Sequence, residues 1–132
     1  RRLDLSELAV EASRIPYLHG KYMNIRADLR GLLVEAEGHY HTIVLHKWLK
    51  YAGKMSPEQS KEWGEEECHL NILKGDIDKF IDGDPEMIDI NKQLGDLKIR
   101  LELVDEMIES INKKNFSVKS AIDFLKFSNG VV

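Results

Sequence analysis

Apolar residues recur at helical spacing along almost the whole chain. The clearest run lies between Pro85 and Lys114, where apolar positions alternate at steps of three and four residues. Its members are Met87, Ile90, Leu94, Leu97, Leu101, Val104, Ile108 and Ile111. This is the a/d pattern of heptad repeats, which is typical of helices that pack along one seam. No stretch alternates with period two for long enough to indicate a sheet, so the pattern predicts an all-α protein.

A second apolar line accompanies the heptad seam. Ile99 and Leu103 are four residues apart and lie off the seam, so a single partner helix would leave them in water. More than one partner helix is therefore expected, either in a helical hairpin or bundle or between copies of the chain.

Capping residues and glycines divide the pattern into elements. The expected helices cover 4–13, 16–51, 57–81, 85–114 and 117–127. Ser56, Pro57 and Gln59 resemble a capping box, and Asp84 before Pro85 supplies another side-chain cap with proline at the first helical position. Gly53 and Asn115 are the expected helix stops.

Charge is distributed unevenly along this single expected domain, 1–132. The net charge of −4 combines +3 in a basic helix at 17–54, −10 over 55–112 and +3 over 113–132. The domain thus divides into that basic helix, an acidic helix at 55–83, and a long heptad helix with a short C-terminal helix at 84–130. A polyanion is expected to bind the basic zones, with the acidic middle facing solvent or another protein.

Composition excludes several classes of protein. With 132 residues, of which 42% are hydrophobic, the chain is long enough for one domain with a core. Cys68 is the only cysteine, so no internal disulfide can form and a reducing, intracellular setting is expected. No run of eighteen apolar residues and no signal-peptide pattern occurs, which predicts a soluble protein with no membrane segment.

One acidic turn imitates a calcium-binding loop without its essential residues. In DGDPEMIDINKQ, Met87 occupies the sixth position, where glycine is needed for the turn. Gln93 occupies the twelfth position, where a bidentate glutamate is needed. No calcium site is expected.

The histidines and the cysteine do not form a recognisable metal or catalytic site. His39 and His41 are two apart and point away from each other on a helix, and His46, Cys68 and His69 lack zinc-ligand spacing. No glycine-rich phosphate loop follows a strand. We therefore expect no cofactor, no metal and no enzymatic activity.

The segment HKWLKYAGK, residues 46–54, concentrates cations and aromatic residues. Lysines attract phosphates, and aromatic faces stack on unpaired bases, so the segment fits a site for single-stranded DNA. The candidate residues are Lys47, Lys50, Lys54, Trp48 and Tyr51, with Arg26 and Arg30 as a further cationic pair four residues apart. The alternative is that Trp48 and Tyr51 are core residues beside a solvated lysine face, and composition alone favours that alternative.

Three quoted segments together resemble the UvsY recombination mediator proteins of T-even-like phages, over most of the chain from about Ser6 to Gly130. HKWLKYAG matches a basic, aromatic run that ends in Tyr-x-Gly, with Lys47 aligned to a cation of the family. DGDPEMIDINKQLGDLKIRLELVDEMIESI matches an aspartate-led turn and long helix. KKNFSVKSAIDFLKF matches the signature that follows, with Asn115 in place of a glycine.

The resemblance implies a function that the residues alone do not. Members of the family are not enzymes. They form ring-like homo-oligomers that bind single-stranded DNA and load a RecA-like recombinase onto strands coated with single-strand-binding protein. It implies the cytoplasm of the infected bacterial host as the location.

Oligomerisation in such a protein is expected along the heptad helix. The candidate residues are Leu94, Leu97, Ile99, Leu101, Leu103, Val104, Ile108, Ile111 and Phe116. The alternative function is a homo-oligomeric helical scaffold or adaptor that does not bind DNA. A scaffold would tolerate the loss of Lys47, Lys50 and Lys54.

Overall fold

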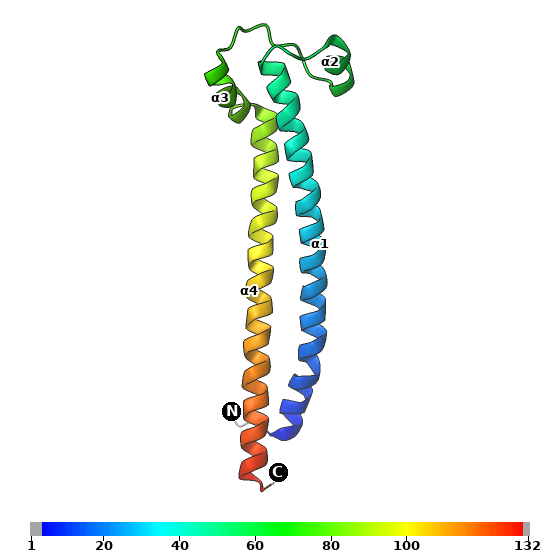
Figure 1. Ribbon diagram of the computed structural model, residues 1–132. Coiled ribbons are helices and arrows are strands. Elements are labelled where there is room, and N and C mark those ends of the chain that lie inside the picture. The colour runs from blue at the N-terminus through cyan, green and yellow to red at the C-terminus, as the bar shows by residue number, and fades with distance from the viewer. Residues whose placement is uncertain (1–3, 131–132) are drawn as a thin grey trace. The chain divides into compact units, whose positions relative to one another are not determined.

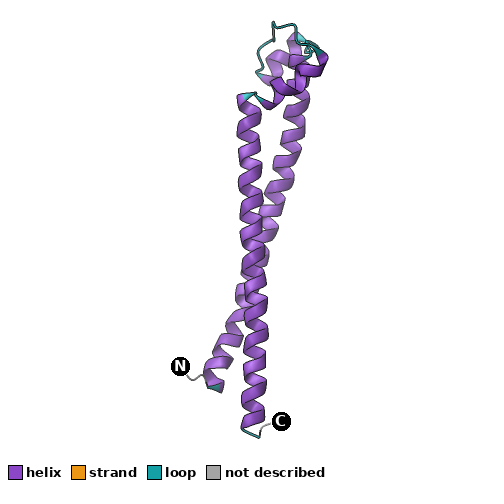
Figure 2. Cartoon of the chain, turned by 90° about the vertical axis from the view of Figure 1, so that its left-hand side faces the viewer, coloured by secondary structure: helices purple, strands orange, loops and turns teal. Residues whose placement is uncertain are grey.

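The computed structural model describes residues 4–130, which fold into helices joined by short loops (Figure 1). The elements in chain order are α1 (Leu5–Tyr51), α2 (Pro57–Trp63), a 3-10 turn η1 (Lys74–Asp76), α3 (Ile77–Asp82) and α4 (Pro85–Ser128). Within residues 4–130 there is no strand (Figure 2). The prediction of an all-α protein is confirmed.

The contacts divide the chain into two compact units. The first comprises the described residues up to 30 together with those from 99 onward, and the second comprises 31–98. α1 and α4 each contribute a segment to both units.

The core of the first unit joins the N-terminal part of α1 to the C-terminal part of α4. Leu8 and Ile15 of α1 are buried with Ile111 and Val118 of α4. An ion pair between Lys114 Nζ and Glu11 Oε2, 2.9 Å long, links the same two helix segments. Apolar side chains thus hold this unit together, with charged pairs at its surface.

The core of the second unit gathers side chains from three helices. Its buried members are Ile43 of α1, Ile77 and Ile81 of α3, and Met87, Ile90 and Leu94 of α4. Trp48 and Tyr51 are half-buried and pack against this cluster. The C-terminal end of α1 is therefore fixed by apolar packing on one side, which leaves its other side for polar contacts.

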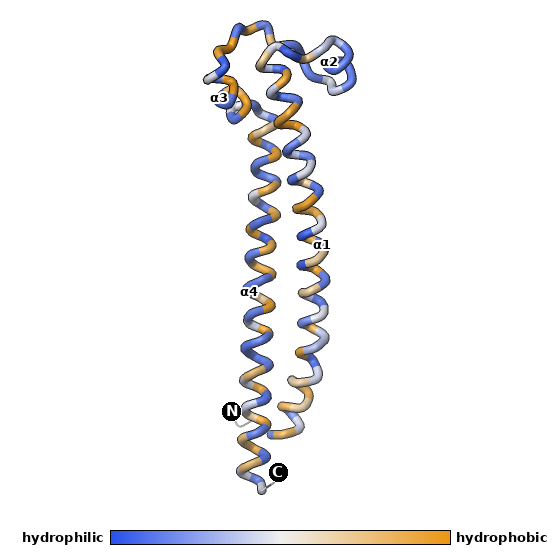
Figure 3. Tube along the Cα trace, viewed as in Figure 1, coloured by the Kyte–Doolittle hydropathy of each residue, from blue (hydrophilic) through white to orange (hydrophobic). Residues whose placement is uncertain are grey.

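The heptad seam faces inward. Of its eight residues, Leu97, Leu101 and Val104 are half-buried and the other five are buried, whereas Ile99 and Leu103 on the second line are exposed. Figure 3 shows the corresponding hydrophobic positions recurring along α4. The subunit therefore buries the seam at least in part by its own packing, and it leaves the second apolar line exposed to solvent.

The predicted breaks near both chain ends are wrong. Pro16 lies inside α1, and α4 continues through Asn115, which is helical and not left-handed. A proline removes one backbone hydrogen bond and crowds the preceding turn. Leu8 and Ile15 before the proline and Leu18 after it belong to one apolar cluster, whose packing keeps the helix continuous.

The predicted helix at 57–81 is also wrong. Gly64 adopts φ +65°, a left-handed conformation that ends α2 after seven residues. The following residues, 65–73, form no helix, and the chain returns to helical structure only at η1 and α3.

The predicted caps are confirmed. Ser56 and Gln59 form both hydrogen bonds of a capping box at α2, and the Glu86 N–H donates to Asp84 Oδ1 at the start of α4, at 2.9 Å. Gly53, with φ +71°, follows the end of α1 as expected.

Gly31 and Gly38, both within α1, are open positions. A Cβ atom built on either glycine meets nothing within 4 Å among the described residues. No other part of the described chain packs closely against α1 at these two glycines. Within residues 4–130 no helix combines the length and apolar character needed to cross a membrane.

Candidate nucleic-acid interface

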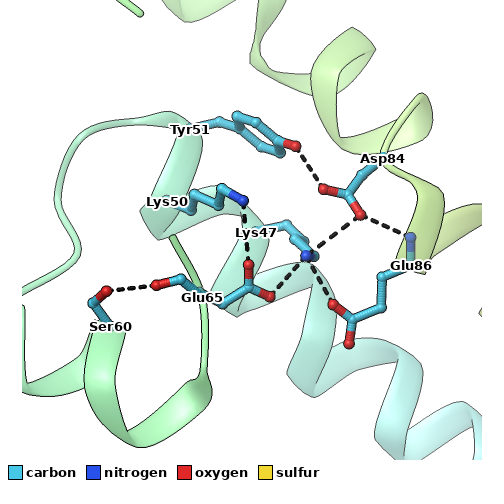
Figure 4. A network of polar contacts seen from close by, with 7 residues as sticks. All are labelled: Lys47, Lys50, Tyr51, Ser60, Glu65, Asp84 and Glu86. Atoms are coloured by element: carbon cyan, nitrogen blue, oxygen red, sulfur yellow. Dashed lines mark hydrogen bonds and ion pairs between the residues drawn. The ribbon is translucent and has the colours of Figure 1, made fainter. Parts of the chain in front are cut away.

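Lys47, the first candidate DNA contact, lies inside the protein. Its Nζ atom is 2.7 Å from Glu65 Oε1, 2.8 Å from Glu86 Oε2 and 3.4 Å from Asp84 Oδ1 (Figure 4). Its side chain is 4% exposed. The sequence prediction of an exposed cation at this position needs correction, because three carboxylates from two other segments enclose the ammonium group.

Two neighbours complete what we call the Lys47 cluster: Lys47, Lys50, Tyr51, Glu65, Asp84 and Glu86. Lys50 Nζ lies 3.3 Å from Glu65 Oε2, and the Tyr51 hydroxyl donates to Asp84 Oδ2 at 2.5 Å. Glu65 therefore bridges two lysines with its two oxygens, while Asp84 accepts from Tyr51 and from the Glu86 N–H. Charged groups this well buried remain stable only when they are paired in this way.

The pKa values reflect the pairing. Burial acts to lower the pKa of Lys47, but hydrogen bonds to Glu65 and Glu86 and the charges of Glu65 and Asp84 hold it above its ordinary value. Burial acts to raise the pKa of Glu65 and of Asp84, but Lys47 and, for Asp84, the Tyr51 hydrogen bond hold both below their ordinary values. Burial and Asp84 raise the pKa of Tyr51 to about 12. Lys47, Glu65 and Asp84 are therefore charged at neutral pH.

The charge balance of the cluster is unfavourable for an anion. Two ammonium groups face three carboxylates, which leaves a net charge of −1. A phosphate that approached Lys47 or Lys50 would meet these carboxylates first and be repelled. In this arrangement neither lysine offers a phosphate site.

Glu65 reaches the cluster from a short segment that rests on α1, which we call the α2 arm, residues 56–65. Within α2 no residue is buried. The Trp63 ring stacks on the His46 ring of α1 with centroids 3.7 Å apart and planes 9° from parallel. The Ser60 hydroxyl donates to the Glu65 carbonyl (Figure 4). The arm thus contacts α1 through one ring stack and through the ion pairs of Glu65 with Lys47 and Lys50.

Lys54 and Trp48 form a different surface at the end of the same helix. Lys54 is exposed, Trp48 is half-buried, and the Lys54 Nζ atom lies 5.1 Å from the centroid of the Trp48 ring. This is cation–π distance. Among residues 4–130, no carboxylate forms an ion pair with Lys54, so no acidic side chain of the described chain neutralises its charge.

The two arginines belong to the other unit. Arg26 Nε pairs with Asp105 Oδ1 at 2.9 Å, with its side chain 27% exposed. Arg30 is exposed, and in the described part of the chain no carboxylate pairs with it. The seven candidates thus fall into three groups. Two cations have no carboxylate partner among the described residues, three cations are paired with carboxylates, and the two aromatic residues also pack against the core.

The nine candidate oligomerisation residues are also sorted. Leu94, Ile108 and Ile111 are buried within the subunit and offer little surface to a second copy of the chain. Leu97, Leu101 and Val104 are half-buried. Ile99, Leu103 and Phe116 are exposed by 56%, 56% and 73%.

The sequence pattern did not reveal Glu65, Glu86, His46 or Trp63 as partners of the basic segment. Asp84 was expected only as a helix cap, and its contact with Lys47 was not anticipated. The one available signal was the charge of −10 over 55–112, which predicts that acidic side chains fold back onto the basic helix before it. Among the described residues, no group of three His, Cys, Asp or Glu side chains is arranged to hold a metal ion.

Comparison with known proteins places this helical architecture in a family. Residues 1–131 match the family described as "Recombination, repair and ssDNA binding protein UvsY", and the chain belongs to this family. A crystal structure of the bacteriophage T4 recombination mediator protein UvsY superposes with a TM-score of 0.79 at 16% identity, covering 97% of this chain and 88% of that one. Comparison with curated protein sequences gives no match.

Proposed function

We propose that this protein is a recombination mediator that binds single-stranded DNA and promotes loading of a RecA-like recombinase onto strands coated with single-strand-binding protein. Family membership over residues 1–131 supports the proposal, and so does the likeness of its fold to the phage T4 mediator. The observation that carries DNA binding is the available Lys54 charge over the Trp48 ring. The proposed setting is the cytoplasm of an infected bacterium.

The proposed DNA contacts begin at this pair. Lys54 neutralises a phosphate, and the exposed part of Trp48 stacks on a base, which contributes about 1 to 3 kcal/mol per base. Arg30 supplies a further exposed cation. The other four candidates already have partners. Tyr51 is hydrogen-bonded to Asp84, and Lys50 is paired with Glu65. Lys47 is paired within the cluster and Arg26 with Asp105, so all four would contact DNA only if these pairs broke.

Homo-oligomerisation is part of the proposal because Lys54 beside Trp48 makes only a weak site in a single subunit. Linking several copies makes later contacts with the same strand intramolecular, which strengthens binding without new chemistry. We propose a ring-like homo-oligomer in which Ile99, Leu103 and Phe116 contact neighbouring subunits. Their support is that each side chain is more than half exposed in the subunit.

The test is a fluorescence-anisotropy titration of labelled oligothymidylate across a salt series. Lys54→Ala is expected to weaken binding and to reduce the salt slope by about one per engaged subunit, because one phosphate contact is lost. Lys74→Ala, at an exposed lysine of η1, is the matched control and is expected to leave both unchanged. A wild-type protein that fails to bind at low salt would support the scaffold alternative, which explains the apolar seam without DNA.

A further inference from the structure

The Lys47 cluster contains a built-in competitor for the proposed DNA site. Glu65 presents its two carboxylate oxygens to Lys47 and Lys50 at 2.7 and 3.3 Å, the distances at which phosphate oxygens bind ammonium groups. Both lysines lie in the basic segment that also carries the available Lys54. The carboxylate therefore occupies the position that a strand extended from Lys54 toward Lys50 would use.

We propose that the α2 arm is an autoinhibitory gate, in which Glu65 imitates a DNA phosphate and must leave Lys47 and Lys50 before single-stranded DNA can engage them. This inference rests on the proposed function, since it concerns the same basic segment. With Glu65 in place the cluster carries a net charge of −1, whereas with Glu65 withdrawn two ammonium groups face two carboxylates and Lys50 has no ion-pair partner. Withdrawal thus removes the repulsion and exposes a second cation one helical turn before Lys54.

The arm is suited to move as a unit. α2 has a capping box at one end and a left-handed glycine at the other, so its capping contacts lie within the arm and do not involve α1. Within α2 no residue is buried, and the Trp63–His46 stack and the Glu65 ion pairs join the arm to α1. Leaving α1 breaks this stack and these ion pairs, and phosphates can replace the ion pairs of Glu65.

When Glu65 leaves, Lys47 keeps carboxylate partners, whereas Lys50 keeps none among the described residues. Asp84 and Glu86 still hold Lys47, and Asp84 is 5% exposed. We therefore assign Lys50 as the main cation released and Lys47 as the residue that keeps the cluster folded. This division predicts that removal of Glu65 leaves the subunit intact.

The first test compares Glu65→Gln with Glu66→Gln in the same oligothymidylate titration. Both variants remove one negative charge, but Glu66 is exposed and forms none of the cluster's contacts. We expect Glu65→Gln to tighten binding about tenfold relative to Glu66→Gln, because a charge-assisted contact no longer competes. Equal effects of the two variants would overturn the gate, since they would indicate long-range charge alone.

A second variant opens the arm without changing charge. Trp63→Ala removes the stack on His46 and is expected to tighten DNA binding about threefold, the size of a typical aromatic pair. Circular dichroism and light scattering show whether each variant keeps its helix content and oligomeric state. Weaker binding by a folded Glu65→Gln or Trp63→Ala protein would mean that the arm forms part of the DNA site, and the inference would be wrong.

The failure of this inference is distinguishable from the failure of the proposed function. If the wild-type protein binds DNA and Lys54→Ala weakens it, the proposed function stands whatever Glu65→Gln does. If the wild type and both arm variants all fail to bind at low salt, the proposed function and the gate fall together.

Discussion

At the scale of single residues, Lys47 contributes to stability by neutralising carboxylates that the fold has already buried. Removing one member of a buried ion pair leaves an uncompensated charge, which costs more than the pair itself contributes. Lys47→Met keeps the length and apolar stem of the side chain but removes its charge. We expect it to lower the free energy of unfolding at neutral pH by about 3 to 5 kcal/mol, measured by urea denaturation.

The effect of Lys47→Met depends on pH in a defined direction. The folded-state pKa values of Glu65 and Asp84 lie below their ordinary 4.5 and 3.8, so the stability they contribute is present above those values and is lost as pH falls through the folded values. The difference between wild type and variant is therefore expected to shrink in acid. Lys79→Met, at an exposed lysine paired only with Asp76, is the control and is expected to change stability by no more than about 0.5 kcal/mol. A pH-independent difference would contradict this account.

At the scale of elements, caps and apolar periodicity could be read from the sequence, and helix continuity could not. Ser56, Asp84 and Gly53 act locally, so their roles follow from their neighbours in the chain. Pro16 and Asn115 were expected to mark helix ends on the same local grounds. Packing of α1 against α4 around them overrides that preference, and a single sequence does not show such packing.

The connector between α2 and α3 differs from its predicted helical structure for a related reason. Trp63, Leu70, Leu73, Ile77 and Phe80 fit a helical spacing, but Leu70 and Leu73 are exposed and form no inward face. Gly64 ends the helix because its left-handed conformation is inexpensive for glycine alone. The DNA site on α1 stays a prediction. Lys54 is exposed there, whereas Lys47 is buried by acids distant in sequence, which local patterns do not show.

Glycine substitutions test this distinction between local and tertiary control. Gly64→Ala is expected to lower the free energy of unfolding by about 1 kcal/mol, because alanine is strained at φ +65° although the space around it is open. Gly38→Ala, inside α1 and equally open, is expected to raise it by up to about 1 kcal/mol through helix propensity. Urea denaturation of the two variants gives opposite signs if backbone conformation alone decides. The same sign for both would indicate a contact at one of these positions with another copy of the chain.

At the scale of the whole molecule, the side chains of the heptad seam are buried or half-buried within the subunit, whereas the second apolar line is exposed. Ile99 and Leu103 are each 56% exposed and belong to neither buried cluster. Exposed apolar side chains one helical turn apart favour contact with another helix, and in the proposed homo-oligomer that helix belongs to a second copy of the chain. Their removal is therefore expected to affect assembly and to spare the subunit fold.

The double variant Ile99→Glu, Leu103→Glu separates these two effects. Light scattering is expected to show a smaller assembly than the wild type, while circular dichroism and urea denaturation of the subunit change little. Ser110→Glu with Asn112→Glu adds the same charge at exposed polar positions of α4 and is expected to leave the mass unchanged.

Because binding along one strand multiplies with the number of linked sites, the dissociated variant is expected to lose about a hundredfold in affinity for a long oligothymidylate. An unchanged mass would place the subunit contact elsewhere, and lost assembly with full DNA affinity would show that a single subunit contains the complete DNA site.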